Sequence, residues 1–168
     1  MRTKVDLLVA VLESSVQQLS REIDEISALP VSPSVKLRRI IASHVRSLDE
    51  HPEHFIYLAE NVHRIISEEG ETILVFGREY GERIRTVITE GIEQGEFRPD
   101  LDPRLAMLAI SGMLNWIHRW YDPNGPNTLA EVGETFADIA IGGLGAPASE
   151  PVSSGASASI QSGNVPGP

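Results

Sequence analysis

The chain has 168 residues, no cysteine and a formal net charge of −10, with 14 Lys and Arg residues against 24 Asp and Glu residues. Without cysteine it has neither a disulfide framework nor a thiolate site. Because affinity for nucleic acid depends on neutralising phosphates, so acidic a chain binds DNA poorly on its own. The length fits one domain with its own hydrophobic core.

The N-terminus is not a secretion signal, because Asp6 and Glu13 interrupt its apolar run. The longest uncharged apolar run extends from Leu105 to Ile117, well short of the roughly 20 residues that span a bilayer. We therefore expect a cytoplasmic protein that does not associate with a membrane.

Helical periodicity dominates the chain and no convincing pair of strands is present, so the sequence predicts an all-α bundle of about six helices. The predicted helices cover residues 3–28, 33–49, 52 to about 70, 71–94, 102–121 and 128–143. From residue 145 the composition changes to Gly, Ala, Ser and Pro, which cannot bury enough surface to offset chain entropy. We expect one domain over residues 1–144 and a disordered tail over 145–168.

Several helix ends have recognisable signals. Asp102 followed by Pro103 predicts the start of the fifth helix, and Gly95 predicts a left-handed stop for the fourth. Thr128 and Glu131 have the spacing of a capping box, which predicts the start of the last helix.

The helix predicted over 102–121 has no charged residue between Arg104 and Arg119, and a helix that is apolar on every side must be enclosed. The helix over 128–143 shows two apolar stripes rather than one. This surplus predicts that the two helices pack against a second copy of the chain as a four-helix dimer interface. The predicted interface residues are Leu105, Leu108, Gly112, Trp116, Leu129, Val132, Phe136 and Ile139. The alternative is a monomer in which both helices are central.

The sequence contains no glycine-rich phosphate loop, no nucleophile elbow and no HExxH motif, so we expect neither an enzyme nor a cofactor. His51 and His54 lie three residues apart, and His44 lies one helix earlier. They lack the ligand spacing of a metal site, and exposed loop histidines are the favoured interpretation of the first two. We therefore expect no metal.

Aromatic residues and methionines on the middle helices would line a cavity for a hydrophobic ligand, with Tyr80 and His118 orienting it. The candidate lining residues are Phe55, Leu58, Val62, Phe76, Tyr80, Met107, Leu114 and His118. The same residues would serve equally well as plain core, and the sequence leaves both interpretations open.

Three stretches resemble the regulatory domain of tetracycline-repressor-like (TetR family) transcriptional regulators. "MRTKVDLLVAVLESSVQQL" resembles its first helix, and "VITEGIEQGEFRPDLDPRLAMLAISGMLNWIHRWYDPNGPNTLAEVGETFADIAIGGL" resembles its last two helices. Within the latter, "EGIEQGEFRPDLDP" and "GMLNWIHRWYDP" are similar to the branch that regulates sterol and fatty-acyl catabolism. The likeness extends over residues 3–144 and lies in the whole pattern rather than in one motif.

The resemblance implies a repressor that binds an effector among its middle helices, dimerises through its last two helices and reads DNA with an N-terminal helix-turn-helix. In the branch named above, the implied effector is a hydrophobic molecule or a coenzyme A thioester. In the family the helix-turn-helix precedes the first helix, whereas here Met1 stands directly before it.

We therefore expect this chain to lack a DNA-binding head. A start assigned too far downstream, a truncated gene and a genuinely headless protein are the three explanations. The alternative function is a stand-alone dimerisation module that pairs with full-length relatives and has no DNA binding of its own.

Overall fold

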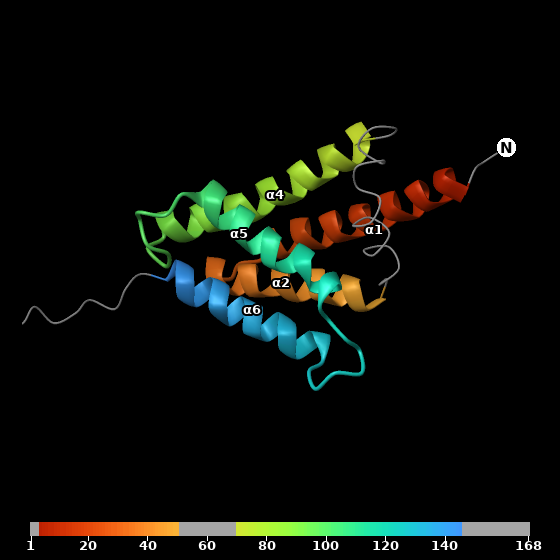
Figure 1. The fold of residues 1–168 in the computed structure, drawn as a ribbon. Helices are drawn as coiled ribbons and strands as arrows, with labels where there is room; N and C mark the ends of the chain where they lie inside the picture. The colour runs from red at the N-terminus through yellow and green to blue at the C-terminus, as the bar shows by residue number, and fades with distance from the viewer. Residues whose placement is uncertain (1–3, 51–69, 146–168) are drawn as a thin grey trace, which may run out of the picture.

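The computed structural model describes residues 4–50 and 70–145, and within these ranges the chain is all-helical (Figure 1). The helices are α1 (Lys4–Ser27), α2 (Pro33–Glu50), α4 (Gly70–Glu93), α5 (Pro103–Trp116), the 3-10 turn η1 (Ile117–Arg119) and α6 (Leu129–Leu144). This confirms the predicted all-α class. The helix predicted to begin at Pro52 lies outside the described residues, as do residues 146–168 of the predicted tail.

The described helices begin and end within one or two residues of the predicted positions, with one exception. The sequence predicts a fifth helix over 102–121, but α5 ends at Trp116 and continues as the 3-10 turn η1. The tighter winding of a 3-10 helix changes the direction in which the following side chains point. Trp120 and Tyr121 therefore do not continue the faces of α5.

Local capping explains where α5 and α6 begin. The Asp102 carboxylate accepts hydrogen bonds from the backbone N–H groups of Arg104 (2.8 Å) and Leu105 (3.1 Å), and Pro103 occupies the first helical position. Thr128 and Glu131 form the predicted capping box. Both caps hold the first turn of a helix whose own N–H groups have no partner within it.

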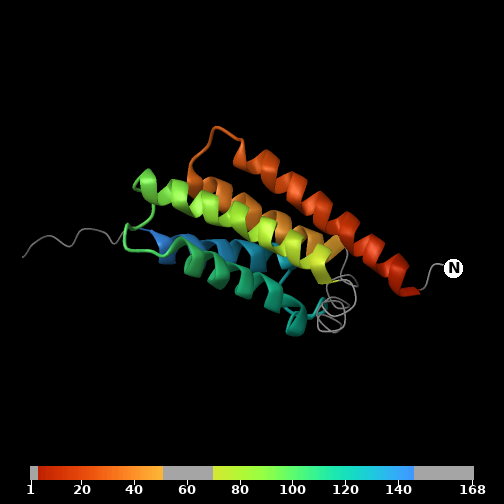
Figure 2. The ribbon, with the colours of Figure 1, turned by 90° about the horizontal axis from the view of Figure 1, so that it is seen from above.

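The helices pack around a central pair, α2 and α4. Figures 1 and 2 show α1 on one side of this pair and α5 on the other, with α6 lying along α2. The side chains with no exposed surface come from α1, α2 and α4 and form the middle of the core: Ile23, Leu37, Ile40, Ile41, Ile84 and Ile88. The α5 helix adds Ile110 and Leu114 to this core from one face only.

The loop after α4 contacts both α4 and the C-terminal end of α6. Gly95 has a φ of 75°, the left-handed conformation predicted for the end of the fourth segment. The Phe97 ring is buried directly against Gly91, at a point where a β-carbon would overlap it. The Arg98 N–H donates to the Leu144 carbonyl oxygen at 2.9 Å.

Within the described ranges, none of the helices combines the length and the apolar character needed to cross a membrane.

Candidate functional site

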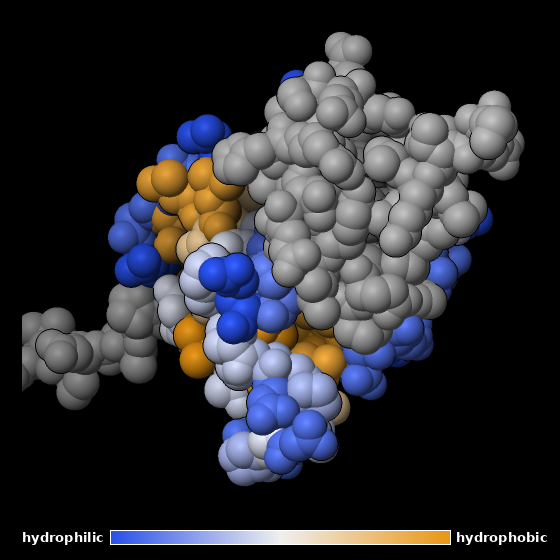
Figure 3. Space-filling model, turned by 45° about the vertical axis from the view of Figure 1, so that its right-hand side comes forward, coloured by the Kyte–Doolittle hydropathy of each residue, from blue (hydrophilic) through white to orange (hydrophobic). Residues whose placement is uncertain are grey.

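An apolar surface runs along α5 and α6. Of the six large hydrophobic residues that are exposed in the described part of the chain, five lie on α5, directly after η1, or on α6. They are Leu105 (59% exposed), Leu108 (47%), Trp116 (60%), Trp120 (49%) and Ile139 (57%). Figure 3 shows orange hydrophobic patches reaching the surface between blue hydrophilic ones on one side of the described residues. We call these five residues the α5–α6 face.

The structure divides the predicted interface residues into two groups. Leu105, Leu108, Gly112, Trp116 and Ile139 are exposed, and Phe136 is half-buried. Leu129 and Val132, in contrast, are buried in the core of the single chain, where α6 packs on α2. The prediction that these two residues are available to a second copy is therefore corrected. The apolar stripe of α6 that faces α2 includes them, and Ile139 lies on a different side of the helix.

Three glycines on α5 and α6 are not required by side-chain packing within the described chain. A β-carbon added to Gly112, Gly142 or Gly143 would meet no atom within 4 Å. At Gly133, by comparison, it would lie 3.4 Å from Val45, so that glycine allows α6 to approach α2 closely. Glycine inside a helix costs roughly 0.5–1 kcal/mol relative to alanine. The single chain therefore gives no packing reason for the first three glycines.

An aromatic cluster joins the two helices at one end of the face. The rings of Trp120 and Phe136 lie 6.2 Å apart between centroids, and those of Trp120 and Tyr121 lie 6.4 Å apart. The Arg119 guanidinium lies 5.6 Å from the centroid of the Trp116 ring, within range of a cation–π interaction. Trp120 is not among the interface residues predicted from the sequence. The sequence predicted one continuous helix through Tyr121, so the 3-10 turn η1 that precedes Trp120 was not expected.

Ion pairs hold α6 and α1 against α2 and α4. Arg38 on α2 donates to Glu134 and Asp138 on α6, both at 2.6 Å. On the opposite side, Arg83 on α4 donates to both oxygens of Asp24 on α1, at 2.5 and 3.1 Å. The Arg83–Asp24 pair is bidentate, a geometry that fixes orientation as well as distance. The Arg38 pairs link α2 to α6, and the Arg83 pair links α4 to α1.

The predicted effector-binding residues are only partly within the described chain. Phe55, Leu58 and Val62 lie outside it, as does the side chain of Phe76. Of the others, Leu114 is buried, and Tyr80 and Met107 are partly buried against the core. His118 is partly buried in η1, and its Nε2 atom is buried with no hydrogen-bond partner among the described residues.

Tyr80 makes a buried hydrogen bond that the sequence did not predict. Its hydroxyl lies 2.7 Å from Nδ1 of His44, and the two rings lie 5.6 Å apart between centroids. Burial lowers the pKa of His44 to about 4, because the charged imidazolium would lose its hydration. Burial raises the pKa of the Tyr80 hydroxyl for the same reason. At neutral pH the pair is therefore uncharged.

No group of three potential metal ligands lies close together within the described ranges. His44, the one described histidine of the set considered above, is hydrogen-bonded to Tyr80 instead. His51 and His54 lie outside the described residues.

The proteins similar to this chain are transcriptional regulators. The HTH-type transcriptional repressor KstR2 of Mycobacterium tuberculosis is 24% identical over 144 residues, which cover 84% of this chain and 72% of the repressor. Its structure, described as that of a ketosteroid transcriptional regulator, matches with a TM-score of 0.80 at 24% identity over 86% of this chain and 74% of the other.

Two further solved structures share the fold. PfmR, a TetR family transcriptional regulator from Thermus thermophilus, matches with a TM-score of 0.75 at 26% identity, covering 83% of this chain and 75% of its own. AibR, in complex with isovaleryl coenzyme A and operator DNA, matches with a TM-score of 0.63 at 22% identity, covering 84% and 75%.

A family model described as the tetracyclin repressor-like C-terminal domain matches residues 30–144. This match covers more than half of the chain. The chain therefore belongs to the tetracyclin repressor-like family, and the matched residues form its C-terminal domain.

Proposed function

We propose that this chain is the effector-binding and dimerisation portion of a TetR-type transcriptional regulator. The observation that carries the proposal is the α5–α6 face, which leaves five large hydrophobic side chains about half exposed in a chain of this family. Monomeric proteins seldom expose contiguous apolar patches of this kind, and such patches mark protein interfaces. A second copy supplies the matching surface, because a two-fold interface brings the same patch of each subunit together.

The position of the glycines supports this interface. Gly112 on α5 and Gly142 and Gly143 on α6 are exposed, and each has open space where a β-carbon would be. Helices with small residues at their crossing point allow two backbones to approach closely. We infer that the partner's helices cross near these three positions, with Leu108 and Ile139 packing beside the crossing.

The α5 helix connects the proposed interface to the core in which the effector binds. Ile110 and Leu114 point into the core, whereas Leu108 and Trp116 are exposed on the proposed interface. A ligand that displaces the inner face of α5 also displaces its outer face, because the helix moves as a unit. The effector would thereby change how the two subunits are arranged, as a two-state regulator requires.

For the effector we propose a hydrophobic small molecule or an acyl-CoA-type thioester, held beside Tyr80, Met107, Leu114 and His118. This proposal is supported by the names of two similar proteins, a ketosteroid transcriptional regulator and a regulator bound to isovaleryl coenzyme A. The neutral His44–Tyr80 pair adds a hydrogen-bonding group to an otherwise apolar part of the core.

For DNA we propose that residues 1–168 do not hold an operator by themselves. The chain carries a net charge of −10, and phosphate binding requires clustered positive charge. Several of its arginines are already engaged by carboxylates, including Arg38 and Arg83. A gel-shift experiment with residues 1–168 is expected to show no sequence-specific complex, and a tight complex would contradict this part of the proposal.

The function is tested by thermal unfolding of residues 1–168 with isovaleryl coenzyme A, longer acyl-CoA thioesters and steroid-CoA thioesters, and with free coenzyme A as the control. A ligand that binds only the folded chain raises the melting temperature in proportion to the logarithm of its concentration. We expect at least one thioester to do so and free coenzyme A to have no effect. Absence of a shift with every thioester would contradict an acyl-CoA-type effector.

A further inference from the structure

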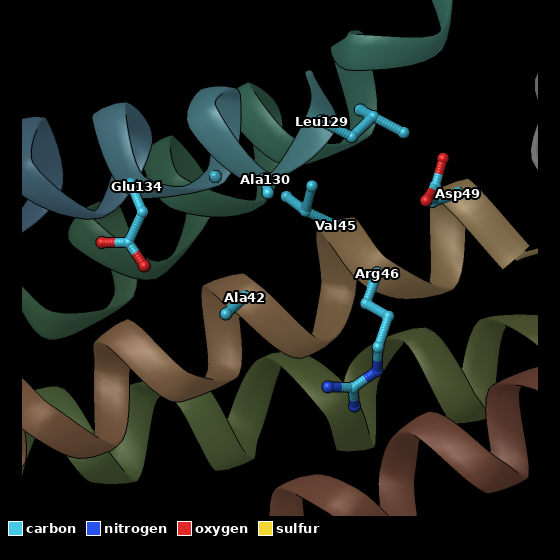
Figure 4. Close-up of a pocket in the computed structure, with 8 residues that line it drawn as sticks. Ala42, Val45, Arg46, Asp49, Leu129, Ala130 and Glu134 are labelled. Atoms are coloured by element: carbon cyan, nitrogen blue, oxygen red, sulfur yellow. The ribbon is translucent and has the colours of Figure 1, made fainter.

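A concave site lies between α2 and α6, away from the core in which the effector is proposed to bind. It is an open groove of about 270 Å³. Its apolar part is formed by Ala42, Val45, Leu129, Ala130 and Gly133. Figure 4 shows Ala42, Val45 and Ala130 between the two helices. The groove exists because three of these residues have a side chain no larger than a methyl group, so that two closely packed helices leave space between them.

One of the charged residues that line the groove has no partner of opposite charge among the described residues. Arg46 is directed away from α6 (Figure 4), and its guanidinium donates to Glu22 on α1 at 2.5 Å. Glu134 accepts from Arg38 at 2.6 Å. Asp49, at the Leu129 end of the groove, forms no ion pair or hydrogen bond with any described residue. The groove therefore combines an apolar floor with one carboxylate that is not neutralised.

Neither the end of α2 nor the start of α6 provides a basic side chain that pairs with Asp49. Asp49 lies in the last turn of α2, which contains no basic residue and has the negative end of the helix dipole. At the start of α6, the Glu131 N–H is already bonded to Thr128, and the Glu131 carboxylate adds a further negative charge. The positive end of the α6 dipole also lies here, but Asp49, Glu131 and the C-terminal end of α2 together leave a net negative charge at this end of the groove, which favours a cation.

We propose that the α2–α6 groove binds a small organic cation, such as a primary amine on a short apolar body, with the ammonium beside Asp49 and the apolar body against Val45 and Ala130. Asp49 is exposed and hydrated, so the charge selects the ligand class through an added ion pair that a neutral or anionic molecule lacks. This site does not depend on the proposed effector or on the proposed dimer. A ligand here bridges α2 and α6, the helix that carries Ile139.

The experiment compares two probes of equal shape on the isotopically labelled full chain, observed by NMR. The probes are 3-phenylpropylamine, which is protonated at neutral pH, and 3-phenylpropan-1-ol, which is neutral. At low salt we expect the amine to bind about threefold to fivefold more tightly than the alcohol, as for a partly exposed charge pair. Both are expected to shift the backbone resonances of Ala130 and Gly133.

Two variants locate the site. Asp49→Asn removes the charge without changing the shape, so the amine and the alcohol should then bind equally. Ala130→Leu fills the groove at an exposed helical position and should abolish binding of both probes. Glu93→Gln removes an exposed carboxylate outside the groove and is expected to preserve the preference for the amine.

The proposal is overturned if neither probe binds at millimolar concentration or if the wild-type chain binds both equally. It is also overturned if the preference for the amine survives Asp49→Asn, since the charge that selects the ligand would then lie elsewhere. Unchanged binding to Ala130→Leu would show that the probes occupy another surface. None of these outcomes bears on the binding of acyl-CoA thioesters.

Discussion

The indole ring of Trp120 packs against the ring of Phe136, with 6.2 Å between their centroids. This contact joins the segment after α5 to the middle of α6. It places an aromatic contact between the exposed side chains of α5 and those of α6. The proposed dimer uses exposed side chains from both sides of this contact.

The first prediction uses the two tryptophans of the chain, Trp116 and Trp120, which both lie on the α5–α6 face. Each is about half exposed in the single chain, and a second copy would remove both from water. We expect the emission maximum of intrinsic fluorescence to shift to longer wavelength when the protein is diluted to the point of dissociation. An emission maximum that does not depend on concentration while the mass falls would contradict their place in the interface.

The second prediction concerns Leu108, which is exposed on α5. Leu108→Asp places a charge where the partner would pack, so we expect self-association to weaken by at least about tenfold, since an unpaired buried charge costs several kcal/mol. Val35→Asp is the matched control, because Val35 is also an exposed hydrophobic residue but lies on α2. Size-exclusion chromatography with light scattering measures both variants. Equal effects of the two changes would argue against the α5–α6 face.

The third prediction separates folding from association at Gly112. Alanine has space there in the single chain and a higher helix propensity, so Gly112→Ala should raise the stability of the isolated subunit by up to about 1 kcal/mol. The same methyl group should weaken the dimer by obstructing the close approach of the partner. Urea unfolding of a Leu108→Asp background measures the first effect, and the dissociation constant of the otherwise native chain measures the second. A tighter dimer would place the helix crossing elsewhere.

The fourth prediction concerns the packing of Phe97 against Gly91. Any β-carbon at Gly91 overlaps the Phe97 ring, so Gly91→Ala should destabilise the fold by about 1–3 kcal/mol through overpacking. Gly77→Ala on the same helix meets no atom within 4 Å and should be neutral or stabilising. Urea denaturation compares the two. Similar stability of both variants would mean that Phe97 can move without cost.

The fifth prediction is a pH dependence that arises from His44. Its pKa is about 4 in the folded chain, below the ordinary value of 6.5 that it regains on unfolding. The unfolded chain therefore binds a proton below about pH 6.5 that the folded chain does not bind until about pH 4. Folding stability should fall by about 2 kcal/mol between pH 7 and pH 5 from this residue alone.

His44→Gln provides the comparison for that prediction, because glutamine can still bond to Tyr80 but does not titrate. The lowered pKa values of Glu22 and Asp24 also reduce stability in acid, and they do so in both proteins. The measurement is therefore the difference between the two proteins in urea unfolding at pH 7 and pH 5. The same pH dependence in both would show that His44 is protonated at its ordinary pKa in the folded chain.

The helix starts were predictable because their signals are local. Asp102 before Pro103, and Thr128 three residues before Glu131, satisfy backbone groups within one turn, so no knowledge of the rest of the fold is needed. Gly95 is a similar case, since its left-handed conformation is set by the turn it occupies.

The orientation of α6 was not predictable in the same way. Its sequence shows two apolar stripes, but periodicity does not reveal which of them faces the rest of the chain. The stripe with Leu129 and Val132 faces α2, where Gly133 allows close contact with Val45. The pairing of His44 with Tyr80 was missed for the same reason, because it depends on how α2 packs on α4.

The most direct test of the proposed dimer is the mass of residues 1–168 in sedimentation equilibrium at micromolar concentration. A dimer through the α5–α6 face gives a species of twice the 18.3 kDa of one chain, which Leu108→Asp converts to a single chain. A wild-type chain that sediments as one folded subunit throughout this range would contradict it, because the exposed side chains of α5 and α6 would then have no second copy to cover them.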